Sequence, residues 1–176
     1  MSQTPYALGS RRELFVEDSL IAGLAGKASL RLHQPIPREV ILTCDRPWEG
    51  NMCGGYKTCL HDGQQFRLYY QCWHGAIYEE EGKTKIRPWP IRIGLLTSPD
   101  GIHWQRPELG IIEFQGSKAN NLVFAGFGDD QLGVHGFAPM LDSNPNCAPE
   151  ARYKALGANA NAWPLKLYAM QSPDGL

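Results

Sequence analysis

Two carboxylates that flank a tryptophan are the residues best suited to chemistry in the first half of this sequence. Asp45 and Glu49 lie on either side of Trp48. An aromatic neighbour desolvates a carboxyl group and raises its pKa toward the range that a general acid needs. Glu49, directly before a glycine, is the better candidate for that role. Asp45 precedes an Arg-Pro pair, and a role as a turn residue explains it equally well.

The second half of the chain carries an acidic pair followed by a histidine. Asp129 and Asp130 come after Gly126-Phe127-Gly128, and His135 follows. The two carboxylates could hold a hard cation such as calcium through oxygen ligands. A plain loop is the preferred interpretation of the pair, and no cofactor is expected. His135 could hydrogen-bond a polar ligand or support the start of a strand. The Gly-x-Gly lacks a third glycine and a following helix, which excludes a dinucleotide loop.

The elements that would position these residues come from a repeat. Ser98-Pro99-Asp100-Gly101 recurs as Ser172-Pro173-Asp174-Gly175, about 74 residues further on. Pro presets φ, Asp can hydrogen-bond its own backbone and Gly supplies a positive φ, so each copy predicts a turn. Apolar residues alternate through 91–97 and through 165–171, which predicts a half-buried strand before each turn.

The repeat extends toward the N-terminus and predicts sheets of four strands. Residues 66–71 correspond to 151–156, and residues 55–62 to 136–142. After the first Ser-Pro-Asp-Gly turn, residues 102–104 indicate a return strand. Four antiparallel strands form the blade of a β-propeller, so the predicted fold class is all-β, of the β-propeller type. The acidic residues at the predicted turns are interpreted as turn formers and not as a catalytic set: Asp62, Asp100, Asp142 and Asp174.

A highly charged loop is predicted between the second and third strands of the first unit. Between residues 74 and 90 the chain carries Glu79-Glu80-Glu81, followed by Lys83, Lys85 and Arg87. A mixed charge run of this kind is typical of a solvated hairpin tip.

The chain is interpreted as one partial domain spanning residues 1–176. About residues 1–42 form an N-terminal segment, about 43–121 the first blade and about 122–176 an incomplete second blade. Within the N-terminal segment, residues 14–21 are apolar with high β propensity and predict a strand, with a short helix as the alternative. One use for such a strand would be to complete the last blade of a closed ring.

Composition excludes several classes of protein. A net charge of −1 encodes no general attraction to nucleic acid or to a membrane surface. No apolar run approaches the ~20 residues of a membrane span, and no secretory leader is visible, which favours a cytoplasmic location. The 5 cysteines include no Cys-x-x-Cys pair, so reduced thiols are expected and a zinc site is not.

Several stretches together resemble a known group, the glycosyl hydrolase family 32 and 43-like proteins, a five-bladed β-propeller class common in planctomycete-type bacteria. The six-bladed sialidases, whose Asp box is similar to the Ser-Pro-Asp-Gly turn, are the minor alternative. The stretches that carry the resemblance are Leu-Phe-Val-Glu-Asp at 14–18, Pro-Trp-Glu-Gly at 47–50, Phe-Arg-Leu-Tyr-Tyr at 66–70, Ser-Pro-Asp-Gly-Ile-His-Trp at 98–104 and Gly-Ser-Lys-Ala-Asn-Asn at 116–121.

The resemblance implies a carbohydrate partner bound in a central funnel. Such glycosidases use one carboxylic acid to protonate the leaving oxygen and one carboxylate as nucleophile or base. The nucleophile motif and the Arg-Asp-Pro triplet of family 32 are absent, so a non-catalytic propeller that binds a glycan or a protein partner is the alternative. A full ring of such units would need on the order of 300 residues or more, which suggests a partial chain. The sequence sets no oligomeric state. The candidate catalytic residues are Glu49, Asp45 and Asp130, and the candidate substrate-binding residues are Trp48, His135 and Trp89.

Overall fold

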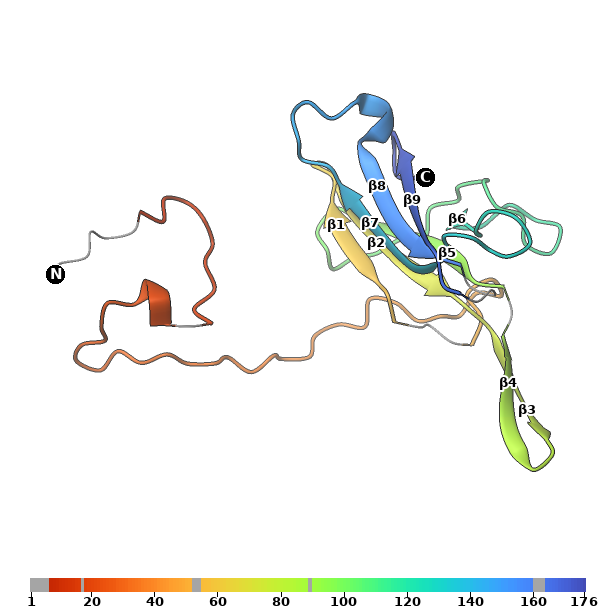
Figure 1. Ribbon diagram of the computed structural model, residues 1–176, viewed down its shortest axis with the longest axis horizontal. Helices are drawn as coiled ribbons and strands as arrows, with labels where there is room; N and C mark the ends of the chain where they lie inside the picture. Colours follow the sequence, from red (N-terminus) through yellow and green to blue (C-terminus); the bar gives the residue numbers. More distant parts are fainter. Residues whose placement is uncertain (1–6, 17, 52–54, 89, 160–163) are drawn as a thin grey trace. The chain divides into compact units, whose positions relative to one another are not determined.

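The computed structural model describes residues 7–16, 18–51, 55–88, 90–159 and 164–176 (Figure 1). The chain divides into two units, residues 1–38 and 39–176. In the described part of the first unit, the only regular element is the 3-10 turn η1 (Asp18–Leu20), closed by a hydrogen bond from Ile21 N to Asp18 O. The strand predicted at 14–21 is therefore wrong, since within the described residues no neighbouring strand pairs with its backbone. No helix in the described residues is long and apolar enough to cross a membrane.

The second unit contains a four-stranded antiparallel sheet with the strands in the order β1-β2-β5-β6. Its long central pair aligns Phe66 with Ser98 at one end and Cys72 with Arg92 at the other. The all-β, antiparallel class predicted from the repeat is confirmed. The strands of this sheet are β1 (Thr58–His61), β2 (Phe66–Cys72), β5 (Arg92–Ser98) and β6 (Leu122–Phe124).

The return strand predicted at 102–104 does not form. After the turn the chain makes only a single bridge, between Thr97 and Gln105. Trp104 Nε1 donates to Gly101 O, which folds the indole back over the turn, and Pro107 has no N–H to continue a ladder. The fourth strand is instead β6, so the first sheet extends past residue 121, the predicted end of the first blade.

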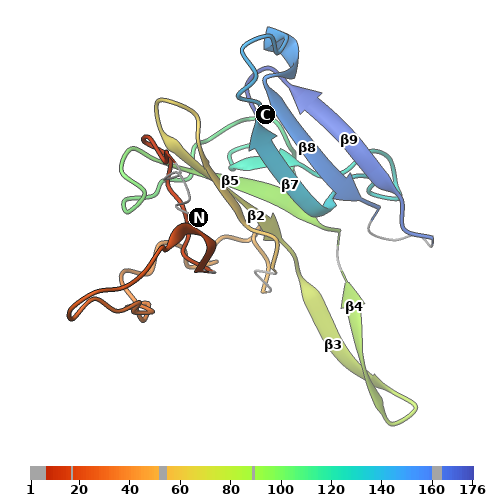
Figure 2. The same ribbon diagram turned by 60° about the vertical axis from the view of Figure 1, so that its left-hand side comes forward.

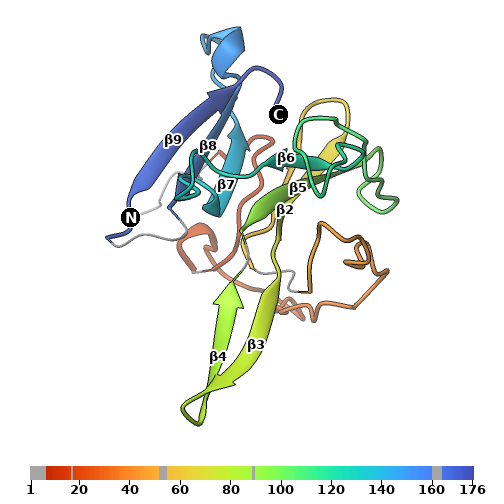
Figure 3. The same cartoon turned by 90° about the vertical axis from the view of Figure 1, so that its right-hand side faces the viewer.

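The charged segment, predicted as a loop with a solvated hairpin tip, forms a separate two-stranded hairpin in which most of the charged residues belong to the strands. Strands β3 (Gly75–Glu80) and β4 (Lys83–Pro88) pair with each other and belong to neither of the larger sheets. Figures 1 and 3 show this hairpin projecting away from the ends of β2 and β5.

A second antiparallel sheet has the order β7-β8-β9. Figure 2 shows its three strands side by side, beside the first sheet. The two first strands, β1 and β7, contact each other. The elements of this part are β7 (His135–Leu141), the short 3-10 turn η2 (Pro149–Ala151), β8 (Tyr153–Ala158) and β9 (Leu167–Ser172).

The two Ser-Pro-Asp-Gly turns share one hydrogen-bond pattern. Ser98 Oγ accepts from Asp100 N and Gly101 N and donates to the Asp100 carboxylate, while Gly101 has φ 77°. Ser172 makes the equivalent bonds with Asp174 and Gly175, whose φ is 79°. The interpretation of these aspartates as turn formers is confirmed. Asp62 and Asp142 likewise accept from backbone N–H groups two residues on.

The first sheet buries both of its faces. One face packs Leu68, Tyr70 and Leu96 against Trp48 and Trp104. The opposite face packs Tyr69 and Leu95 against residues that lead into or belong to the second sheet, Val134 and Phe137. The sheets are also linked by polar contacts: Arg67 Nη1 donates to Asp174 O at 2.6 Å and Tyr69 Oη donates to Gly175 O at 3.0 Å. The second Ser-Pro-Asp-Gly turn is thereby fixed against β2.

Candidate functional site

Glu49, the first catalytic candidate, is completely buried beside the end of β2. Its backbone carbonyl accepts from Trp73 N, which ties the segment around residue 49 to the sheet. Its side chain is 0% exposed. Oε1 accepts from Tyr70 Oη at 2.6 Å and from Arg106 Nε at 2.8 Å. Oε2 accepts from Arg46 N at 3.0 Å and from Arg106 Nη2 at 3.1 Å.

These four contacts occupy the whole acceptor capacity of the carboxylate, which is about four lone-pair sites. Burial, together with the nearby Cys72 and the bond to Glu49, raises the pKa of the Tyr70 hydroxyl well above its usual value. The hydrogen bonds from Arg106 to Glu49 raise the pKa of that guanidinium. Tyr70 therefore stays a neutral donor and Arg106 a permanent cation. Glu49 is held as a structural anion, with no acceptor site left for a reacting group.

Trp48 and Asp45 complete this cluster from opposite sides. Trp48 packs against the core of the first sheet, and its Nε1 donates to Asn121 Oδ1 at 2.7 Å. Asn121 in turn donates to Tyr70 Oη, so the network is continuous through the buried sheet. The Asp45 side chain is 57% exposed and lies 3.2 Å from Arg106 Nη2. A surface hollow of about 380 Å³ lies beside Trp48, Arg106 and Asn121.

The structure thus brings the three candidates into one structural cluster. Arg106 links Asp45 to Glu49, and Asn121 and Tyr70 link Trp48 to Glu49. Because its ring packs on the core and its N–H is already bonded, Trp48 is committed to the fold more than to stacking on a ligand. Trp89, the other stacking candidate, lies outside the described residues.

The strand register places the entry to β1 at the same end of the first sheet as Glu49. The first residue of β1, Thr58, pairs with Tyr69 in the middle of β2, so the residues before Thr58 lie toward the C-terminal end of β2, where Cys72 pairs with Arg92 at the start of β5. The chain enters β1 through Tyr56. The entry to β7 is brought beside it, because Tyr56 and His135 meet edge to face with ring centroids 5.5 Å apart. We call Tyr56, Lys57 and His135 the entry site.

Tyr56 has two features that distinguish it from the packed aromatic residues. Its side chain is 60% exposed, and its φ is 55°, in the left-handed region that bulky residues rarely adopt. Backbone outliers of this kind concentrate at functional sites. His135 is half-buried and opens β7, so the structure joins both interpretations of this residue: it begins a strand and lines the entry site.

Asp130 lies in a tight turn and not in a cluster of acids. Phe127 and Leu132 close this turn by pairing with each other, and Asp129 and Asp130 are exposed at its tip. The adjacent Gln131 is buried, and its side chain bonds to both backbone groups of Ile91. Among the residues that the structure describes, no group of three or more His, Cys, Asp or Glu side chains could hold a metal ion. A calcium site at Asp129 and Asp130 has no further ligand from this set.

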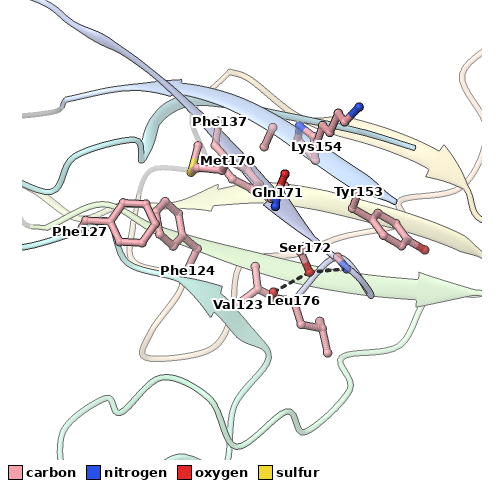
Figure 4. A pocket seen from close by; sticks show the side chains of 13 residues that line it. Val123, Phe124, Phe127, Phe137, Tyr153, Lys154, Met170, Gln171, Ser172 and Leu176 are labelled. Carbon is pink, nitrogen blue, oxygen red and sulfur yellow. Dashed lines mark hydrogen bonds between the residues drawn. The ribbon is translucent and has the colours of Figure 1, made fainter. Parts of the chain in front are cut away.

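An apolar cleft of about 290 Å³ lies between the two sheets (Figure 4). Phe124 and Phe127 from the first sheet and its loop face Met170 and Tyr153 from the second. At one end of the cleft, Ser172 Oγ lies 3.1 Å from Leu176 O, which competes with the Asp174 carboxylate for the single hydroxyl hydrogen. The cleft holds no pair of acids among its lining residues, so it offers apolar contact and no acid–base chemistry.

Sequence reasoning missed Tyr56 because it assigned residues 55–62 to a strand. A strand residue has negative φ, and only the structure reveals that the chain turns through the left-handed region before β1 begins. A signal was present in the Gly54-Gly55 pair ahead of Tyr56, since such pairs mark turns.

Comparison of the chain with protein-family models, with curated proteins and with solved structures found no match.

Proposed function

We propose that this chain is part of a carbohydrate-active β-propeller and that its entry site contributes to binding a glycan. Support for the propeller comes from a four-stranded antiparallel sheet followed by a second sheet with the same turn chemistry. In a propeller, the first strand of each blade lines the central channel. The contact between β1 and β7 is consistent with that arrangement.

The observation that carries the proposal is the exposed ring of Tyr56 against His135 at the entry to both first strands. An aromatic ring offers a flat apolar face, and tyrosine adds a polar handle at its tip. An imidazole can donate or accept a hydrogen bond from a hydroxyl group. Lys57, the next residue along the chain, is also exposed. Sugars present both C–H faces and hydroxyl groups, so this combination suits a glycan.

Binding is favoured over hydrolysis for the described residues. Glycoside hydrolysis needs one carboxylic acid and one free carboxylate, about 5 to 9.5 Å apart around the scissile bond. The Glu49 carboxylate has all its acceptor sites filled, and Asp45 is paired with Arg106. Asp130 stands on a separate turn. The three candidate carboxylates of this chain therefore do not form the pair of acidic groups that hydrolysis needs.

Glycan-array binding of the purified chain tests this proposal. We expect Tyr56→Ala and His135→Ala each to weaken binding of any recognised glycan by about two- to tenfold, because one aromatic or hydrogen-bonded contact is worth about 0.5–1.5 kcal/mol. Phe127→Ala is the matched control, since Phe127 is 55% exposed and belongs to another loop. Loss of binding in the control alone, or equal binding by all variants, would contradict the assignment.

A further inference from the structure

The second sheet repeats the register of the first. In each sheet the serine of the Ser-Pro-Asp-Gly turn pairs with the first residue of the second strand, Ser98 with Phe66 and Ser172 with Tyr153. Counting along the strands from these two pairs gives the positions of the first sheet their equivalents in the second. Because alternate residues of a strand point to opposite faces, equivalent residues also lie on equivalent faces.

Equivalent faces of the two sheets have opposite surroundings. Tyr69 and Ile93 lie on the face of the first sheet that packs against the second, and each is 1% exposed. Their equivalents in the second sheet are Leu156 and Leu167, which are 53% and 76% exposed. Met140, also 53% exposed, lies on the same face, because it pairs with the strand neighbour of these residues. We call this face, with Met140, Leu156 and Leu167, the outer face.

A charged pair is repeated as well. In the first sheet Asp62 follows β1 and binds Arg67, and in the second sheet Asp142 follows β7 and binds Lys154. The Arg67 side chain is 15% exposed, and its Nη1 donates to Asp174 O in the turn of the second sheet. The Lys154 side chain, at the equivalent position, is 44% exposed. The outer face thus repeats both the apolar side chains and the cation by which the first sheet holds its neighbour.

A second copy of this chain offers no matching surface among the residues that the structure describes. The first sheet is covered by the inner face of the second sheet, where Ala155 and Met170 line the cleft together with Phe124 of the first sheet. That inner face is therefore already used within each copy. The other face of the first sheet packs against Trp48 and Trp104. A partner of the outer face must consequently bring a further sheet.

We propose that the outer face docks a further antiparallel sheet of the same kind, in the arrangement that joins the first sheet to the second. The partner sheet presents apolar side chains to Leu156 and Leu167 and a Ser-Pro-Asp-Gly turn to Lys154. Lys154 takes the part of Arg67 and donates to the backbone carbonyl of the aspartate in that turn. The contact is head to tail, because unlike faces meet. This inference rests on the propeller part of the proposed function and not on glycan binding.

A chain extended after Leu176 by a second copy of residues 103–176 tests the proposal, because Leu176 stands at the position of Ile102 in the repeat. The added copy supplies a sheet and a turn of the required kind. It carries Lys154→Arg, so that only the original Lys154 is read when lysine acetylation is followed by mass spectrometry.

Acetylation of the original Lys154 should be at least about threefold slower in the extended chain than in the unextended chain, since its exposure falls from 44% toward the 15% of Arg67. Lys85 is the matched control: its side chain is 43% exposed and pairs with Glu80, and it should react equally fast in both chains.

Urea unfolding gives a second readout. Leu156→Asp in the original sheet should lower the unfolding midpoint of the extended chain by about 1 M, because it places a charge in the new interface. The same change in the added copy is the control, since the outer face of that copy stays open.

Three results would each overturn the proposal: an added copy that circular dichroism shows unfolded, equal acetylation of Lys154 in both chains, or equal effects of the two Leu156→Asp changes. So would self-association of the unextended chain that Leu156→Asp abolishes, because the occupant would then be a second copy. None of these results bears on glycan binding at the entry site, so the two proposals fail separately.

Discussion

Replacement of Glu49 by glutamine should destabilise the second unit by about 3 kcal/mol, because it breaks a buried ion pair. Glutamine keeps the size of the side chain but presents an NH₂ group where Oε2 accepts from Arg46 N and Arg106 Nη2. The N–H groups of Arg46 and Arg106 would then face the glutamine NH₂ group, which cannot accept a hydrogen bond. Breaking a buried pair costs about 3–5 kcal/mol. The lower end applies here, since the Arg106 side chain is 24% exposed and keeps Thr43 O and Asp45 as partners.

Urea unfolding followed by tryptophan fluorescence measures this cost, since Trp48 belongs to the same network. Asp45→Asn is the control: it removes another carboxylate from Arg106, but one that is 57% exposed, so it should cost less than about 1 kcal/mol. If Glu49→Gln were as stable as Asp45→Asn and lost glycan binding instead, Glu49 would be a functional residue and our reasoning about its saturated carboxylate would be wrong.

Two further predictions concern packing and pH. Gly157→Ala should lower the folding stability by at least about 3 kcal/mol or prevent folding, because the added Cβ would lie 1.8 Å from Gly133 O. Gly55→Ala is the control: nothing lies near the added Cβ, so thermal unfolding should show almost no change in stability. Partial burial raises the pKa of Asp62, but hydrogen bonds from Gln65 N, Gln64 N and Arg67 outweigh it and lower that pKa to about 2. The stability from Asp62 is therefore present above about pH 4 and lost as the pH falls toward 2, and Asp62→Asn should remove about 1 kcal/mol of that pH dependence. If the Asp62→Asn variant lost as much stability between pH 5 and pH 2 as the wild-type chain does, this prediction would be contradicted.

Local turn chemistry made much of the fold predictable from the sequence. Ser98-Pro99-Asp100-Gly101 and its repeat carry their own hydrogen-bond partners, so the turns and the strands before them could be located. The fourth strand of the first sheet could not be located in this way, because it depends on which distant segment pairs with β5. Residues 102–104 have strand-like composition, yet the Trp104 side chain bonds to Gly101 instead. The segment that pairs with β5 is β6, which begins about eighteen residues after residue 104.

The site was only partly predictable, for a related reason. The sequence places Glu49 beside Trp48 but does not reveal that Arg106 reaches it from 57 positions away. That contact turns a candidate acid into a structural anion. Tyr56 became a candidate only when the structure placed it against His135, since neither a positive φ nor contact between two strand entries can be read from composition.

The central claim is that the entry site binds a glycan, and nitrogen–proton NMR of the labelled chain, titrated with soluble oligosaccharides, tests it most directly. The account predicts saturable shift changes at residues 55–58 and 134–136, with Asn121 and the Glu49 network unmoved. Shifts confined to the hollow beside Trp48 and Arg106, or no shifts with any oligosaccharide, would contradict it.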